Sequence, residues 1–198
     1  MKLSKICEEI EYTLLQGSIE TEVRDVIYDS RKIAPETMFV CMVGAVTDGH
    51  KYIPDAIDKG ASVIVLEREE EAAQIPENIT VLKVASARLA LALMSAALFD
   101  HPARKLVTIG LTGTKGKTTT TYLIRSILEG VGHKVGLIGT IEAIIGDRKI
   151  PAANTTPESF TIQQYFALMV EEGCDRVVME VSSQGLMLHR TAGIPFEI

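Results

Sequence analysis

The chain contains no tryptophan, and aromatic residues make up only 5% of its 198 residues. Basic residues are also in the minority, since 20 lysines and arginines stand against 26 aspartates and glutamates, which gives a net charge of −6. We therefore do not expect the broad basic face on which nucleic-acid-binding proteins depend. A small anionic ligand remains compatible with this composition, because it needs only a few local cations and backbone donors.

Cysteines are few, and the 3 present are far apart in the sequence. Their number and spacing predict neither a disulfide framework nor a zinc cluster, and the 4 histidines show no paired ligand spacing. Long apolar runs are absent as well, because the longest, at 89–99, is too short to cross a bilayer. Acidic residues at positions 8 and 9 interrupt the region where a secretion signal needs apolar residues. We expect a cytoplasmic protein without membrane association.

The most informative segment is Gly113–Thr121, GTKGKTTTT, which lies between a β-branched apolar run at 106–109 and an amphipathic helical pattern. Glycines allow the backbone to turn sharply and to bring its N–H groups close to phosphate oxygens. A helix N-terminus favours negative charge, and a lysine followed by a hydroxyl supplies a phosphate cation and a Mg²⁺ ligand. The pattern predicts a nucleotide-binding phosphate loop, although the generic motif would have a glycine at Leu111. The alternative is a flexible loop before a helix.

A second candidate element is the apolar run from Arg176 that ends in the carboxylate of Glu180. Magnesium prefers hard oxygen ligands and shares them with substrate phosphates. Glu180 and Thr118 are therefore a candidate Mg²⁺ pair. The alternative is a solvated glutamate at the end of a strand.

The first half of the chain predicts a small α/β domain. The expected strands are 22–28, 38–43, 62–66 and 80–84, and the expected helices are 52–59 and 86–99, after a short helix and a loop in 1–20. The polar, proline-containing stretch 101–105 predicts a boundary between domains at 1–103 and 104–198.

The second half predicts a partial P-loop domain with a doubly wound parallel sheet, because strands and helices alternate. The expected strands are 106–112, 134–139 and 176–182, with helices at 118–131 and 157–172 and a hairpin at 141–150. Thr156 and Pro157 have the pattern of a helix start, with a hydroxyl cap and a proline at the first position. Sheets of this kind have about five or more strands, and 196–198 resembles the opening of another, so we expect a part of a longer protein.

Other short motifs each have a local explanation when taken alone. Asp29-Ser30-Arg31 is explained by an Asx turn, and Asn154–Pro157 by a capped helix start. Gln184 is explained as a strand-end amide and the pair 189–190 as a solvated pair.

Taken in order, these motifs resemble the Mur ligases of peptidoglycan synthesis. The resemblance rests on TGTKGKTTT at 112–120, NTTP at 154–157, EVSSQGLMLHR at 180–190 and the segments DSRKIAPETMFVCMVG at 29–44 and DGHKYIPDAIDKGASVIVLE at 48–67. It covers essentially the whole chain and is most specific for the type that adds the third amino acid to the UDP-N-acetylmuramoyl dipeptide.

The resemblance implies an α/β substrate-binding domain at 1–103, the first part of an ATP-binding domain at 104–198, and the cofactors ATP and Mg²⁺. Its implied partners are UDP-N-acetylmuramoyl-dipeptide and an amino acid. We expect no nucleic-acid or membrane partner, and we expect the protein to be a monomer. ATP would phosphorylate a peptide carboxylate, and an amine would then displace phosphate from the acyl phosphate. The implied catalytic residues are Lys117 and Glu180, and the implied metal ligands are Thr118 and Glu180.

The implied ATP-binding residues are Gly113, Thr114, Lys115, Gly116, Lys117, Thr118 and Thr119. Ser30 and the loop Ala45-Val46-Thr47 would bind the uridine end. The muramoyl-peptide part would be bound by Asn154, Thr155, Thr156, Ser182 and Arg190.

The chain departs from the family pattern at three positions. A histidine is often found where this chain has Ala45, many members have a histidine in place of Gln184, and some have a glutamine in place of Leu188. In the family, further metal ligands and the domain that selects the amino acid lie beyond residue 198. We therefore expect no ligase activity from these 198 residues alone, and the choice of diaminopimelate or lysine as the added amino acid would belong to that further domain. Two alternatives stay open: a non-catalytic module that binds nucleotides or UDP-sugars, and a ligase that adds glutamate to folate.

Overall fold

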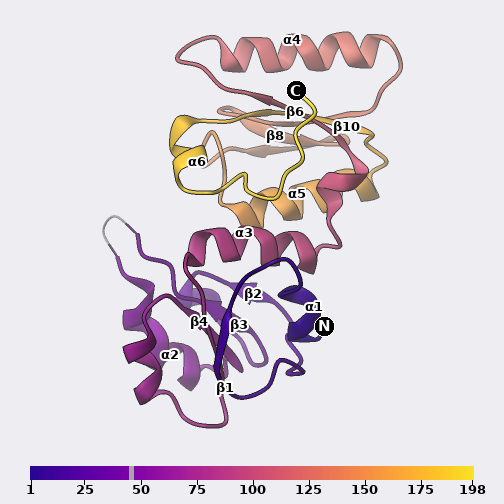
Figure 1. Ribbon diagram of the computed structural model, residues 1–198. Coiled ribbons are helices and arrows are strands. Elements are labelled where there is room, and N and C mark those ends of the chain that lie inside the picture. The colour runs from indigo at the N-terminus through magenta and orange to yellow at the C-terminus, as the bar shows by residue number, and fades with distance from the viewer. Residues whose placement is uncertain (45–46) are drawn as a thin grey trace. The chain divides into compact units, whose positions relative to one another are not determined.

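The chain forms two five-stranded sheets within residues 1–44 and 47–198, the part that this computed structural model describes (Figure 1). One sheet lies in a compact unit of residues 1–98 and the other in a unit of residues 99–198. The division falls close to the expected boundary after residue 103, near the 3-10 helix η4 (Pro102–Lys105). The assignment of a binding function to each domain stays a prediction.

The first sheet has the strand order β1-β5-β4-β3-β2, in which β5, β4, β3 and β2 are parallel and β1 is an antiparallel edge strand. Its strands are β1 (Thr13–Gln16), β2 (Val26–Ile27), β3 (Met38–Val40), β4 (Val63–Leu66) and β5 (Thr80–Lys83). Its helices are α1 (Leu3–Ile6), α2 (Ile53–Asp58) and α3 (Ala87–Leu98), with 3-10 helices η1 (Ser30–Lys32), η2 (Gly49–Tyr52) and η3 (Glu69–Gln74).

Strand β4 shows why this unit has a parallel sheet. All four of its residues are buried, and Ile64 and Leu66 share one hydrophobic cluster with Ile53 and Ala56 of α2. Because side chains alternate along a strand, Val63 and Val65 lie on the opposite face. Burial on both faces is typical of parallel strands covered by helices.

Strand β1 lies in a region that the sequence predicts to be loop, and that prediction was wrong. Its residues are exposed or half-buried, so they show no hydrophobic period. The strand exists because it pairs with β5, with Leu14 opposite Leu82. By contrast, the helix expected at 86–99 is present as α3, and Ser86 caps it by accepting a hydrogen bond from the Leu89 N–H at 3.3 Å.

The second sheet has the order β6-β10-β7-β8-β9. Strands β6, β10 and β7 are parallel, and the predicted hairpin of β8 and β9 joins the same sheet antiparallel to β7. The elements are β6 (Val107–Leu111), α4 (Lys117–Gly130), β7 (Val135–Ile138), β8 (Glu142–Ile145), β9 (Arg148–Pro151), α5 (Ser159–Glu171), β10 (Arg176–Glu180) and α6 (Ser183–Met187).

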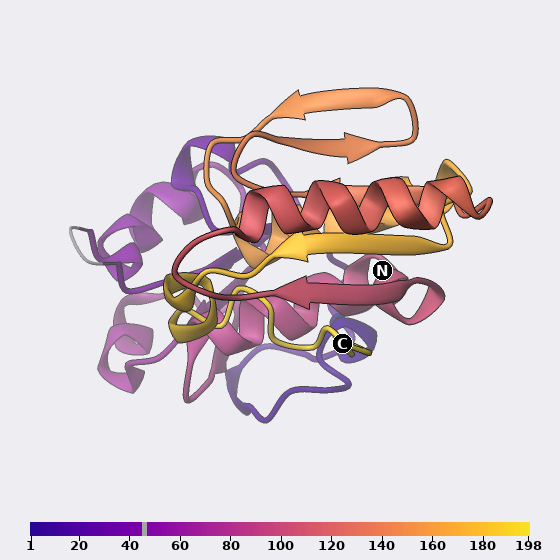
Figure 2. The same ribbon diagram turned by 90° about the horizontal axis from the view of Figure 1, so that it is seen from above.

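Two helices cover the two faces of the second sheet. Ile124 and Leu128 of α4 pack against Val178 on one face, and Phe166 of α5 shares a cluster with Val177 on the other. Figure 2 shows α4 running along β10, with the hairpin of β8 and β9 at the far edge. A helix on each face of a parallel core confirms the doubly wound α/β class.

The predicted start of α5 was wrong. The helix begins at Ser159, and the carboxylate of Glu158 accepts a hydrogen bond from the Ser159 N–H at 3.2 Å. The hydroxyl of Thr156 does not cap this helix, because it lies 3.0 Å from the carbonyl oxygen of Glu180 and donates there. A tertiary contact has therefore replaced the local one.

No helix in the described residues is both long enough and apolar enough to cross a membrane.

Candidate functional site

The carboxyl ends of three parallel strands meet at one edge of the second sheet. Glu180, the last residue of β10, is in register with Leu111, the last residue of β6. On the other side of β10, Met179 is in register with Ile138, the last residue of β7. Ligands of open α/β sheets bind outside this edge, because the loops that follow the strands gather there.

The loop after β6 has the geometry of an anion-binding turn. Gly113 and Gly116 have φ values of +145° and +84°, which side chains rarely adopt. Helix α4 begins at Lys117, and among the described residues no side chain caps its first turn. Its first amide groups are therefore suited to an anion. The Lys117 Nζ folds back over the loop and donates to the carbonyl oxygen of Gly113 at 2.7 Å.

Glu180 is buried at this edge, with 1% of its surface exposed. Its Oε2 accepts hydrogen bonds from the hydroxyls of Thr118 and Thr140 at 3.1 and 3.0 Å. Its Oε1 accepts from the Thr140 N–H at 2.9 Å. The alternative of a solvated glutamate is therefore wrong, because the carboxylate is buried and held by three donors.

The pair Thr118 and Glu180 has the chemistry of a magnesium site. Both offer hard oxygen atoms, and these are 3.1 Å apart. The described part of the chain has no cluster of three His, Cys, Asp or Glu side chains that could hold a metal. A cation here would take its other ligands from water and phosphate, which is how Mg²⁺ is usually held beside nucleotides. The residues present fit that ion.

Sequence reasoning missed Thr140 and Gly139, which follow β7 directly. Thr140 supplies two of the three hydrogen bonds to Glu180. A Cβ on Gly139 would lie 2.6 Å from the Glu180 Oε1, so a residue without a side chain is required there. The signal in the sequence is a small and a hydroxyl residue at the end of a third parallel strand.

Hydrogen bonds connect most of the residues predicted to bind the peptide substrate to Glu180. The Thr140 hydroxyl lies 3.0 Å from that of Thr155. The Thr156 side chain lies within hydrogen-bond distance of the Glu180 carbonyl and the Ser182 N–H, each at 3.0 Å. Ser182 in turn caps α6. Asn154 is exposed beside Thr155.

Arg190 is the remaining member of this group, and it is already engaged within the protein. One terminal nitrogen of its guanidinium donates to the Thr156 carbonyl oxygen at 2.9 Å. Its Nε lies 3.3 Å from a carboxylate oxygen of Glu158. The arginine therefore holds the segment before α5 in place.

The first unit contains a cavity of about 560 Å³ that brings together Ser30 and Thr47. These two residues are distant in sequence, and both were predicted to bind a uridine. The cavity is also lined by Tyr28, Phe39, Tyr52 and Arg88. Ala45 and Val46, the rest of the predicted uridine loop, lie outside the described residues.

Ser30 reaches this cavity from the Asx turn that its neighbours make. The Asp29 carboxylate accepts from the Arg31 N–H at 3.1 Å and from two guanidinium nitrogens at 2.8 and 2.7 Å. The hydrogen bonds from Arg31 lower the pKa of Asp29 to about 2. The local explanation of this motif is therefore correct for Asp29 and Arg31, and the turn places Ser30 in the cavity wall.

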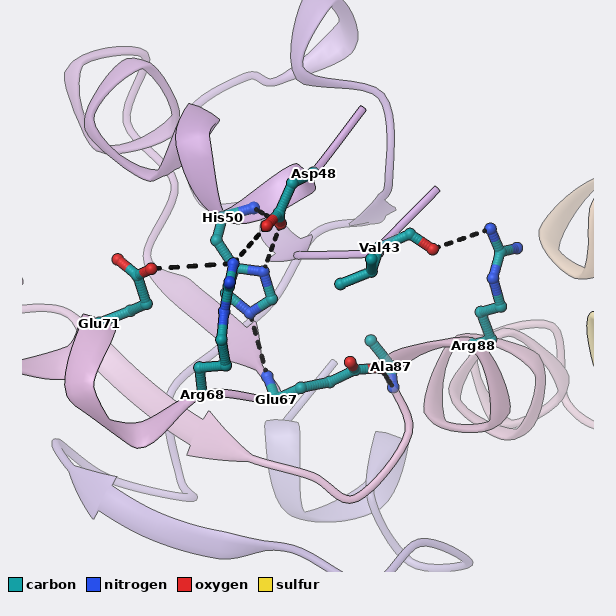
Figure 3. A network of polar contacts seen from close by, with 8 residues as sticks. All are labelled: Val43, Asp48, His50, Glu67, Arg68, Glu71, Ala87 and Arg88. Atoms are coloured by element: carbon teal, nitrogen blue, oxygen red, sulfur yellow. Dashed lines mark hydrogen bonds and ion pairs between the residues drawn. The ribbon is translucent and has the colours of Figure 1, made fainter. Parts of the chain in front are cut away.

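A network of polar contacts holds Val43 and Asp48, which lie on either side of the segment that includes Thr47 (Figure 3). Val43 and Asp48 form a β-bridge, and the Gly44 N–H donates to the Thr47 carbonyl oxygen at 2.8 Å. Asp48 then pairs with Arg68, which comes from the segment after β4.

The buried side chain of His50 connects Asp48 to the backbone of Glu67. Its Nδ1 lies 2.7 Å from the Asp48 carboxylate, and its Nε2 accepts from the Glu67 N–H at 3.2 Å. Because Nε2 accepts, the ring proton is assigned to Nδ1. Burial by itself would raise the pKa of Asp48, but hydrogen bonds from His50 and Arg68 outweigh it and lower the pKa to about 2. Sequence reasoning did not identify this network.

Comparison with protein families matches two parts of the chain. Residues 111–198 match the Mur ligase middle domain, and residues 22–101 match the Mur ligase family, catalytic domain.

Among curated proteins, the chain is 48% identical over 196 residues to a UDP-N-acetylmuramoyl-L-alanyl-D-glutamate–2,6-diaminopimelate ligase of Clostridium tetani, covering 99% of this chain. It is also 48% identical to a ligase of the same name from Clostridium acetobutylicum. The chain spans about 40% of the length of these relatives.

Among solved structures, a UDP-N-acetylmuramoyl-L-alanyl-D-glutamate–2,6-diaminopimelate ligase superposes on this chain with a TM-score of 0.80 at 21% sequence identity. The superposition covers 100% of this chain and 39% of the ligase. MurF ligase from Thermotoga maritima in complex with ADP superposes with a TM-score of 0.57 at 21% sequence identity. That superposition covers 88% of this chain and 36% of the MurF chain. At this identity the likeness shows a shared fold.

Proposed function

Because this chain belongs to the Mur ligase family, we propose that it carries the UDP-substrate and ATP sites of a ligase that acts in peptidoglycan synthesis. That enzyme adds the third amino acid to UDP-N-acetylmuramoyl-L-alanyl-D-glutamate. We infer 2,6-diaminopimelate as the amino acid, because it is part of the names of the relatives that are 48% identical. The observation that carries the proposal is the cluster of Lys117, Thr118 and buried Glu180 at the end of β6 and β10.

In the proposed reaction, the terminal carboxylate of the dipeptide attacks the γ-phosphate of ATP and forms an acyl phosphate, with ADP leaving. The amine of the incoming amino acid then forms the amide bond and phosphate departs. The cation of Lys117 and the amides at the start of α4 stabilise the charge of the transferring phosphoryl group. To reach it, Lys117 exchanges its bond to the Gly113 carbonyl for phosphate oxygens. Gly113–Gly116 and Thr119 line the phosphates.

Thr118 and Glu180 would hold Mg²⁺ through their oxygens. When bound, the ion supplies positive charge to the phosphate oxygens. Thr140 orients the Glu180 carboxylate through two hydrogen bonds.

The substrate contacts divide between the two units. Ser30 and Thr47 would bind the uridine end in the 560 Å³ cavity of the first unit. Asn154, Thr155 and Arg190 would contact the muramoyl-peptide part. Thr156 and Ser182 would act on it indirectly, since their hydroxyls are used for hydrogen bonds within the protein.

Titration of the 198-residue chain with ATP and Mg²⁺ by calorimetry tests the proposal. We expect Lys117→Ala to weaken binding about tenfold or more, because a charge-assisted contact to phosphate is lost. The matched control is Lys149→Ala, which removes the charge of a lysine on β9, outside the loop. Equal affinity of the wild type and Lys117→Ala would refute the assignment of the loop.

A further inference from the structure

Arg88 is a cation in the cavity wall to which no role has been given so far. It is the second residue of α3 and lines the same cavity as Ser30 and Thr47. A guanidinium nitrogen donates to the Val43 carbonyl oxygen at 3.2 Å, as Figure 3 shows. The side chain therefore reaches from the helix to the base of the loop that carries Thr47.

The charges around the cavity favour an anion. Of the described residues that line it, Arg31 and Arg88 are basic and Asp29 is acidic, so their charges sum to +1. The Arg31 guanidinium contacts the Asp29 carboxylate at two points.

The place of Arg88 on its helix also favours an anion. It lies in the first turn of the twelve-residue helix α3, where the helix dipole is positive and disfavours a cation. Glu67 accepts a hydrogen bond from the Ala87 N–H of the same turn at 2.7 Å, which compensates part of that charge. A negative group in the cavity would interact favourably with both the dipole and the guanidinium.

We propose that Arg88 binds the diphosphate of the nucleotide whose uridine occupies the cavity with Ser30 and Thr47. This inference rests on the proposed binding of a UDP-linked substrate. The planar fork of a guanidinium matches two phosphate oxygens. Since Arg88 also contacts the Val43 carbonyl, one side chain joins the diphosphate to the loop that carries Thr47.

Titrations of the 198-residue chain with uridine and with UDP, followed by NMR chemical shifts, separate the two parts of the ligand. We expect the wild type to bind UDP more tightly than uridine. In Arg88→Gln, UDP binding falls about tenfold or more, because a charge-assisted contact is lost, while uridine binding is unchanged. The shorter amide removes the charge but keeps a donor beside Val43. Arg88→Lys restores part of the UDP affinity, since it keeps the charge without the fork.

The control is Arg24→Gln, which changes the net charge equally at an exposed residue outside the cavity and leaves UDP binding unchanged. Equal loss of uridine and UDP binding in Arg88→Gln would show that the arginine only supports the loop and would overturn the inference. Unchanged UDP binding in this variant would overturn it as well. Failure of the wild type to bind either ligand would instead overturn the proposed function, and the inference with it.

Discussion

Glu180 illustrates how much a single residue of this protein depends on its neighbours. The carboxylate is 1% exposed, and burying a charge in this way is costly unless hydrogen bonds compensate. Thr118 and Thr140 supply those bonds, and Gly139 leaves the space for the carboxylate. The same contacts hold the acid at the end of β10, beside the start of α4.

Replacement of Gly139 by alanine tests this arrangement. The new methyl group would lie 2.6 Å from the Glu180 Oε1, so the carboxylate must move away from the Thr140 N–H. We expect Gly139→Ala to lower the free energy of unfolding by about 1–3 kcal/mol, as overpacking usually does. Weaker binding of ATP with Mg²⁺ should accompany this loss, and both are measurable by thermal unfolding and calorimetry.

Gly130→Ala is the matched control. Gly130 is the last residue of α4, and a Cβ placed there would have no described atom within 4 Å apart from its chain neighbours and the nearby backbone of its own helix. This variant should be as stable as the wild type or more stable by up to about 1 kcal/mol, because alanine favours helix. If both glycine variants behaved alike, the close contact with Glu180 would have no effect on stability.

At the scale of elements, contacts from several parts of the first unit hold the described residues on either side of positions 45–46. A β-bridge joins Val43 to Asp48, and Arg88 contacts Val43 from α3. His50 and Arg68 contact Asp48. Two helices and a strand end thus position Thr47 in the cavity wall.

The pKa of Asp48 gives these contacts a predictable pH dependence. Since the pKa in the folded state is about 2, below the ordinary value of 3.8, the carboxylate stabilises the fold above pH 4. That contribution is lost as pH falls from about 4 through about 2. Asp48→Asn should therefore be less stable than the wild type by about 1–2 kcal/mol at pH 7, and the difference should shrink across this window.

Urea unfolding of both proteins between pH 7 and pH 2 measures this effect. Asp58→Asn, a change at an exposed aspartate of the same unit, serves as the control and should follow the wild type. A difference between wild type and Asp48→Asn that is constant across the range would contradict the assigned role of the carboxylate.

At the scale of the whole molecule, each candidate site lies within a single unit. The cavity is lined by residues of 1–98, and the glycine-rich loop before α4 and Glu180 belong to 99–198. Each unit has its own sheet and its own buried cluster, which is what independent folding requires.

Separate expression of residues 1–98 and 99–198 checks whether the sites are independent. We expect the first piece to bind UDP and the second to bind ATP with Mg²⁺, each within about threefold of the whole chain, because the contacts of each site are internal to one unit. Dispersed NMR spectra would establish folding, and titrations would give the affinities. A folded piece that has lost its ligand would show that its site needs the other unit.

Several local features were predictable because short-range forces decide them. The helix that starts after Ser86 and the glycine-rich loop before α4 follow from capping and from glycine geometry. The start of α5 was wrong because the Thr156 hydroxyl bonds to β10 instead of to its own helix. β1 was missed because pairing with β5, and not a hydrophobic period, makes it a strand.

The amino-acid sequence by itself determined the α/β class, the glycine-rich turn before α4, the proximity of Thr118 to Glu180 and the likeness to Mur ligases. These depend on local patterns and on motifs that stay in order along the chain. Tertiary structure alone decided that Thr140 and Gly139 enclose Glu180, and that Arg88 meets Ser30 and Thr47 in one cavity. Their side chains meet because parallel strands bring distant loops to one edge of a sheet, and no pattern within a short stretch of sequence records that meeting.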